Sequence, residues 1–124
     1  MTRVAVVACA VLVLAWLGVM ERSVRLQASG TEAADRRDLA GAEADFRAAR
    51  QLNPDTLPDV QRAFLYQGSG RSDEAVRLLE DVLRREPDNL EAWGLLYAFT
   101  SERDPATAER ALEARRRLDP LAAR

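Results

Sequence analysis

Residues 63–75 read AFLYQGSGRSDEA, which predicts the end of one helix, a tight turn and the start of another. Gly68 and Gly70 favour the turn, because glycine reaches backbone angles that other residues avoid. Ser72-Asp73-Glu74 offers a cap and two acids for the positive end of a helix, and Arg84-Arg85 suit its negative end. The stretch therefore predicts a helical hairpin.

The same pattern occurs three times in register, since Pro54, Pro87 and Pro120 stand 33 residues apart. Before each proline comes a small residue, a large apolar residue four later, and in two of the three repeats a small or apolar residue three after that. These positions are Ala42, Phe46 and Ala49, then Ala75, Leu79 and Val82, then Ala108, Leu112 and Arg115. Spacings of four and three place them on one helix face, and proline ends the helix or opens the next turn.

This register resembles the tetratricopeptide repeat (TPR) family, whose unit is two antiparallel helices with the pattern W-x2-L-G-x2-Y, then A-x3-F and a terminal P. Trp93 begins the match in the third unit, and Gly30 takes the glycine position in the first. A period of 33, Tyr97 in place of glycine and Arg115 at a small-residue site depart from the pattern. The resemblance covers about residues 23–120 and implies a stack of helix pairs.

The apolar run of residues 4–20, VAVVACAVLVLAWLGVM, contains no charged side chain. At about 1.5 Å per residue it spans about 25 Å, near the short limit for crossing a bilayer. A core helix and a cleaved signal are the alternatives, but repeats are poorly shaped to wrap a helix, and no small-residue cleavage pattern follows. Val6-Val7-Ala8-Cys9 is placed too early for a lipoprotein box. We expect a signal-anchor helix with Cys9 as a small apolar residue, the alternatives being a disulfide-linked dimer or lipid attachment.

The predicted fold class is all-α, with a single N-terminal transmembrane helix followed by a short α-solenoid of about three TPR-like helix pairs. The predicted segments are a tail at 1–3, the transmembrane signal-anchor helix at 4–20, and a TPR-like domain at 21–124 with units at about 23–55, 56–88 and 89–120. Only Ser29-Gly30 could interrupt a helix after the run, so we expect one long rod. Capping patterns at Asp88-x-x-Glu91 and Asp104-Pro105 predict two further helix starts.

The side of the membrane stays open. Arg22, Arg25, Arg36 and Arg37 follow the apolar run and only Arg3 precedes it, which by the positive-inside rule places the domain in the cytoplasm. A three-residue N-terminal tail is also typical of export signals, which gives a slight preference for the extracytoplasmic side.

Composition excludes most catalytic and metal-binding classes. The chain has 18 basic residues, all of them arginine, 20 acidic residues, no histidine and one cysteine, and its net charge is −2. Zinc sites need several nitrogen or sulfur ligands, and histidine-based general bases are impossible here. No positive field for nucleic acid and no glycine-rich phosphate loop is present. We expect no enzyme activity, cofactor, nucleic acid or small-molecule substrate, and the arginine-only, alanine-rich composition is typical of a GC-rich bacterium.

Two surfaces are candidates for binding a partner protein or a second copy of the chain. The first is the end of the stack, where Leu95, Phe99, Leu118 and Leu121 stay uncovered if no capping helix follows. Packing against neighbouring helices is the alternative explanation for these apolar residues.

The second candidate is the concave groove, which by the resemblance is lined by the first helix of each unit. The positions implied to face inward are Val60, Phe64, Gln67, Glu91, Gly94, Ala98 and Ser101. Because the chain lacks lysine and has Gln27 and Thr31 at the corresponding first-unit positions, the carboxylate clamp of some family members is not expected.

Arg115-Arg116-Arg117 could attract anionic lipid headgroups, although solvated cations at a helix C-terminus are the favoured interpretation. Taken together, the sequence predicts a membrane-anchored protein-binding module that acts as scaffold or adaptor for a membrane or cell-envelope assembly. The alternatives are an accessory subunit bound mainly through its transmembrane helix, and a regulatory protein that faces the cytoplasm.

Overall fold

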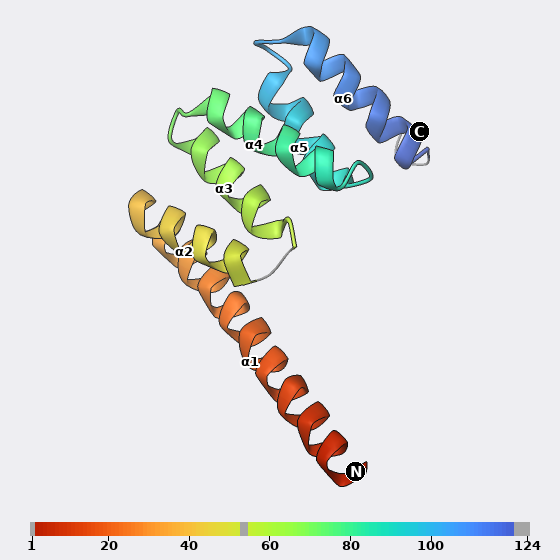
Figure 1. The fold of residues 1–124 in the computed structure, drawn as a ribbon. Coiled ribbons are helices and arrows are strands. Elements are labelled where there is room, and N and C mark those ends of the chain that lie inside the picture. The colour runs from red at the N-terminus through yellow and green to blue at the C-terminus, as the bar shows by residue number, and fades with distance from the viewer. Residues whose placement is uncertain (1, 53–54, 121–124) are drawn as a thin grey trace. The chain divides into compact units, whose positions relative to one another are not determined.

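The computed structural model describes residues 2–52 and 55–120, and these residues form helices joined by short turns (Figure 1). The helices are α1 (Thr2–Asp35), α2 (Leu39–Leu52), α3 (Leu57–Gly68), α4 (Ser72–Arg85), α5 (Leu90–Thr100) and α6 (Pro105–Leu118). The predicted all-α fold class is confirmed. By their internal contacts the helices group into residues 1–58 and residues 59–124.

The predicted continuous rod is present, because α1 runs unbroken from the apolar run into the first repeat. Gly30 lies inside this helix and does not interrupt it. The helix ends where Arg37 takes a left-handed backbone angle, with φ of 62°. The backbone N–H of Asp38 donates to the carbonyl of Ala33 at 2.9 Å, which closes the helix as glycine usually does at such ends.

Helix α2 runs antiparallel to α1 and packs on its C-terminal half. Three contacts establish the direction: Ser23 with Ala49, Ser29 with Asp45, and Gly30 with Phe46. The Phe46 ring lies so close to the Gly30 backbone that a Cβ there would stand 2.7 Å from it. The small residue in α1 therefore makes room for the large residue in α2.

The second group of helices has its own core, built from one face of each of α3 to α6. Leu79, Val82 and Leu96 are fully buried at its centre, and Trp93 and Tyr97 pack against it while remaining partly exposed. The repeating pattern thus identifies the core of α2 and α4. In α6 it is rotated, since the buried residues there are Ala108, Ala111 and Ala114, and Leu112 and Arg115 are half-buried.

One predicted helix cap is confirmed and two are displaced by a residue. Asp104 caps α6 and accepts from the backbone N–H of Thr107 at 3.1 Å. Asn89, rather than Asp88, caps α5, because a turn closed by its N–H on the carbonyl of Glu86 delays the helix start. Ser72 is the first residue of α4, and Arg71 takes the cap position without a side-chain cap bond.

Candidate functional site

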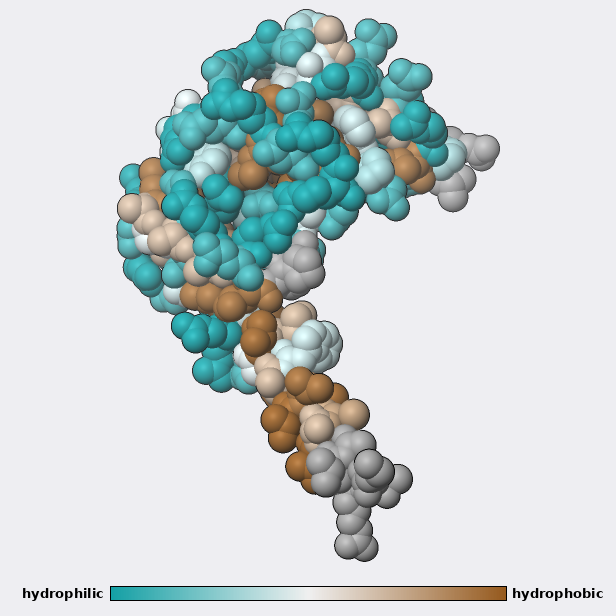
Figure 2. All heavy atoms as spheres, in the orientation of Figure 1, coloured by the Kyte–Doolittle hydropathy of each residue, from teal (hydrophilic) through white to brown (hydrophobic). Residues whose placement is uncertain are grey.

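The apolar side chains of the first half of α1 lie exposed along the helix. Val6, Leu12, Leu14 and Trp16 each expose 60% or more of their surface. Figure 2 shows this apolar (brown) surface along the part of α1 that lies beyond the repeat. The helix is long and apolar enough to cross a membrane. Such exposure is unlike a core helix, which would bury these side chains.

An aromatic pair joins α3 and α5 in the second group of helices. The ring centroids of Phe64 and Phe99 are 6.2 Å apart, and the ring planes are tilted by 56°. Phe64 exposes 63% of its surface, whereas Phe99 packs against the core. One turn along α3, Gln67 is half-buried, and its side-chain oxygen has no hydrogen-bond partner. The pair therefore presents apolar surface close to a buried amide oxygen that has no hydrogen-bond partner.

A hollow of about 330 Å³ lies on the α4 side of Phe99. Phe99 and Thr100 of α5 line it together with Val76 and Arg77 of α4 and with Arg103. Arg103 is paired with Asp73 at 3.0 Å. Phe99 thus borders a hollow that is lined by two arginines and two aspartates, so its charges are balanced.

The other residues predicted for the groove take different positions. Val60 is buried in the core. Glu91, Ala98 and Ser101 are exposed. Gly94 lies under the Arg115 side chain, whose Nε would be 3.7 Å from an added Cβ. The structure thus brings Phe64 next to Phe99, and it places Val60 and Gly94 where other parts of the protein cover them.

The residues predicted for the end of the stack differ in exposure. Leu95 and Phe99 are half-buried against the core. Leu118, the last residue of α6, exposes 38% of its surface. Leu121 lies outside the described residues. Packing against the core accounts for a large part of the apolar surface of α5.

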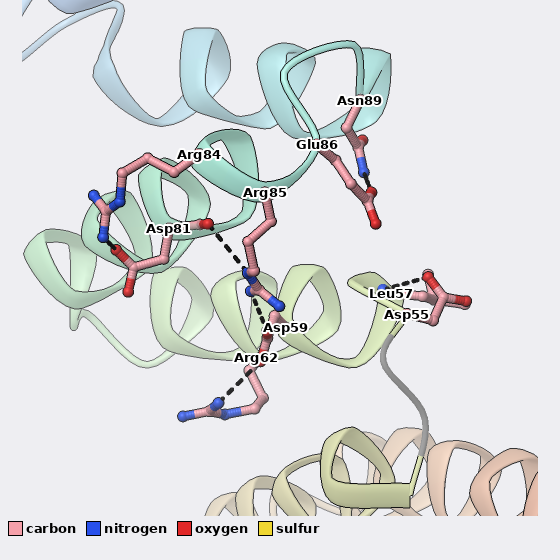
Figure 3. A network of polar contacts seen from close by, with 9 residues as sticks. All are labelled: Asp55, Leu57, Asp59, Arg62, Asp81, Arg84, Arg85, Glu86 and Asn89. Atoms are coloured by element: carbon pink, nitrogen blue, oxygen red, sulfur yellow. Dashed lines mark hydrogen bonds and ion pairs between the residues drawn. The ribbon is translucent and has the colours of Figure 1, made fainter.

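Sequence reasoning missed a buried carboxylate that connects α3 with α4 (Figure 3). Asp59, in the first turn of α3, is only 4% exposed. Its two oxygens accept from Arg62 at 3.2 Å and from Arg85, the last residue of α4, at 2.5 Å. Asp59 could be assigned to a helix start from the sequence, but nothing in the sequence pairs it with an arginine 26 residues later.

The carboxylates whose titration is shifted also serve local structure. The Arg71 guanidinium holds the pKa of Glu74 below its usual value, through hydrogen bonds of 2.5 and 2.8 Å. The hydroxyl and then the backbone N–H of Thr107 lower the pKa of Asp104. Among the described residues no group of three or more acidic or cysteine side chains is placed to hold a metal ion. These charges fix turns and caps.

The described fold is an α-solenoid of antiparallel helix pairs, and comparison with known proteins assigns its family. The tetratricopeptide repeat family matches residues 33–99, more than half of the chain. The chain therefore belongs to the tetratricopeptide repeat family. The structure is similar to the Arabidopsis OM64 TPR domain, with a TM-score of 0.69 and 16% identity, covering 82% of this chain and 86% of that one. No curated protein matches the sequence.

Membership of this family gives a coarse function. TPR domains generally bind other proteins or peptides, and they are typically interaction modules without catalytic activity. The fold and the family thus define a protein-binding domain preceded by an apolar helix.

Proposed function

We propose that this chain is a membrane-anchored TPR adaptor that holds a partner protein beside a bacterial membrane. Residues 4–20 cross the bilayer as an uncleaved anchor, and the aromatic pair of Phe64 and Phe99 is the centre of the protein-binding surface. The adaptor serves a membrane or cell-envelope assembly.

The exposure of Phe64 is the observation that carries the binding surface. The α3 residues Val60, Ala63 and Tyr66 are buried, so they form the face of the helix that packs on the core. Phe64 lies beside this face and is exposed. Buried aromatic anchors dominate the energetics of protein interfaces. A partner's apolar side chain placed on the Phe64 ring would bury it and complete the contact with Phe99.

Gln67 adds a polar element to the same surface. Its side-chain oxygen lies within the fold without a hydrogen-bond partner. Because this oxygen is enclosed in the free protein, the Gln67 side chain has to rotate outward before its amide can bond the backbone of an extended peptide or the side chains of a partner helix. The surface therefore supports a protein ligand with an apolar side chain flanked by polar groups.

The test compares partner capture by two single variants of the full-length, C-terminally tagged protein in mild detergent. Phe64→Glu places a charge on the proposed surface, and Leu39→Glu, at the first residue of α2, places the same charge on another exposed leucine. We expect Phe64→Glu to lose the partner and Leu39→Glu to keep it. Retention by both variants would contradict the surface. Self-association of differently tagged copies, lost with Phe64→Glu, would identify the partner as a second copy.

The exposed apolar surface of α1 favours a second candidate function. Leu12, Leu14 and Trp16 each expose 60% or more of their surface, whereas most large apolar side chains of the described repeats are buried or half-buried. A subunit held in a complex mainly by its transmembrane helix would keep its partner in Phe64→Glu and lose it when residues 4–20 become a polyleucine helix. The same polyleucine variant would keep the partner of an adaptor.

The side of the membrane decides between an envelope adaptor and a regulator that faces the cytoplasm. A dual reporter fused after Arg124, with one half active only outside the cytoplasm and the other only inside, makes this distinction. Activity of the outer half would support the envelope role, and activity of the inner half would support the regulator.

A further inference from the structure

Helix α2 closes onto α1 almost at the end of the apolar run. Ser23 stands three residues after Met20, is completely buried, and donates its hydroxyl to the carbonyl of Ala49 at 3.4 Å. Ala49 lies in the last turn of α2. The first repeat therefore begins within one helical turn of the proposed membrane anchor, with no flexible linker between them.

The short separation between Met20 and Ser23 places the last turn of α2 at the membrane surface. This inference rests on the proposed anchor. Three residues of helix rise by about 4.5 Å. The headgroup layer on each side of the hydrocarbon is about 5 to 8 Å thick. Because paired helices lie about 9 Å apart, a tilt of about 20° moves α2 up or down by only about 3 Å. In either case the Ala49 end of α2 stays close to the headgroups.

Arginines flank the contact between Ser23 and Ala49 on both helices. Arg22 precedes Ser23, is exposed, and makes no ion pair among the described residues. Arg50 follows Ala49 in the last turn of α2. Arg50 also has an interaction within the protein, but a guanidinium carries five N–H donors, which is enough for a second acceptor.

The net charge of the residues near the contact between Ser23 and Ala49 is positive. Arg25, one turn further along α1, is paired with Glu21 at 2.5 Å, and both side chains are mostly exposed. Asp55 follows the end of α2. The three arginines at this end of the repeat, at positions 22, 25 and 50, therefore outnumber the two acids. Guanidinium groups bind phosphate through paired N–H donors, and each arginine near an anionic membrane adds to the attraction.

We propose that the C-terminal end of α2 lies in the headgroup layer, where Arg22 and Arg50 bind the phosphates of anionic lipids. The first repeat is thereby seated on the membrane, and the bilayer serves as the surface that covers this end of the repeat. The lipid acts as a structural ligand that fixes the direction in which α2 leaves the membrane.

The position of α2 can be measured with spin labels on the full chain in lipid nanodiscs. In a Cys9→Ser background, Gln51→Cys labels the last turn of α2 and Ala40→Cys labels its first turn, and both native residues are exposed. The two labels are about 16 Å apart along the helix. Because magnetic relaxation falls steeply with distance, lipids with gadolinium on the headgroup should relax the label at 51 about tenfold faster than the label at 40. Equal rates would overturn the inference.

The lipid preference tests the arginines. Nanodiscs of phosphatidylcholine with and without phosphatidylglycerol are compared, and the association of spin-labelled phosphatidylglycerol with the protein is measured relative to phosphatidylcholine. We expect the preference to fall by about fivefold for each arginine removed in Arg22→Gln/Arg50→Gln. Arg36→Gln/Arg37→Gln, at the far end of α1, is the matched control and should keep it.

The outcomes separate this inference from the proposed function. Failure of the wild-type chain to float with vesicles would contradict the anchor itself. Flotation with no relaxation at position 51 would leave the anchor intact and overturn the seating of α2. A fast-relaxing label at 51 with the same lipid preference in both double variants would overturn phosphate binding by Arg22 and Arg50.

Discussion

Removing the Asp59 carboxylate should lower the unfolding free energy of the second group of helices by more than the loss of an exposed ion pair would. In Asp59→Ala, Arg85 loses the acceptor of its 2.5 Å bond, and Arg62 loses one at 3.2 Å. The bond to Arg85 attaches the first turn of α3 to the last turn of α4, and the bond to Arg62 lies within α3. The change therefore acts on the pairing of the two helices of one repeat.

The magnitude follows from the burial of the three side chains. Breaking a buried ion pair costs about 3 to 5 kcal/mol, because the remaining charge is left without a partner. Asp59 is 4% exposed and the Arg62 side chain 15% exposed, but the Arg85 side chain is 36% exposed and can regain water. The lower end of the range applies, so we expect a loss of about 3 kcal/mol. That is a large part of the stability of a small domain.

Trp93 provides the assay, because it belongs to the same group of helices as Asp59. In a Trp16→Phe background its fluorescence reports urea unfolding of the full chain in detergent. Asp81→Ala is the matched control, since it removes the same charge from an exposed pair with Arg84. The control should lose no more than about 0.5 kcal/mol. Equal losses in the two variants would refute the assignment of a buried, stabilising carboxylate.

Three further predictions concern single positions. Gly30→Ala should destabilise the α1–α2 pair by about 1 kcal/mol, because overpacking against Phe46 exceeds the gain in helix propensity; hydrogen exchange of α2 measures this, and adding Phe46→Leu should reverse it. Arg37→Gly should stabilise the same pair by about 1 kcal/mol, since glycine adopts the left-handed angle without strain; a lower urea midpoint would contradict this. Asp104 has a lowered pKa in the folded state, because Thr107 donates to its carboxylate, so its contribution is complete above about pH 4 and is lost as the pH falls through the folded pKa. Asp104→Asn should therefore flatten the acid limb of a pH–stability curve, and an unchanged limb would rule out this contribution.

The sequence predicted the fold because the determinants of helix pairs are local. Alternating small and large residues at spacings of four and three define a buried helix face wherever a second helix packs on it. This holds for Ala42 and Phe46 in α2 and for Ala75 and Leu79 in α4. It fails in α6, where the face is rotated, because the half-buried Arg115 lies over Gly94 instead of entering the core.

The candidate surface was less predictable because it depends on pairs of residues far apart in the chain. Phe64 and Phe99 were named separately, one for the groove and the other for the end of the stack, and only the structure brings their rings together. Val60 shares the spacing of Phe64 on α3, but the core covers it. Which of two apolar residues on one helix stays exposed is decided by the neighbouring helices, and periodicity alone does not contain that information.

Helix α1 has to satisfy two environments, and its residues change in size where the environment changes. Between Ser23 and Ala33 the buried positions are small, Gly30 among them, which lets the large Phe46 ring of α2 approach the backbone closely. Before Met20 the helix has bulky side chains such as Leu12 and Trp16 on its exposed surface. Small residues favour a close protein neighbour, and bulky apolar ones favour lipid or a loosely packed partner helix. The transition at Met20 and Ser23 therefore marks where the proposed membrane contact ends and the repeat begins, and a single continuous helix transmits the orientation of one to the other.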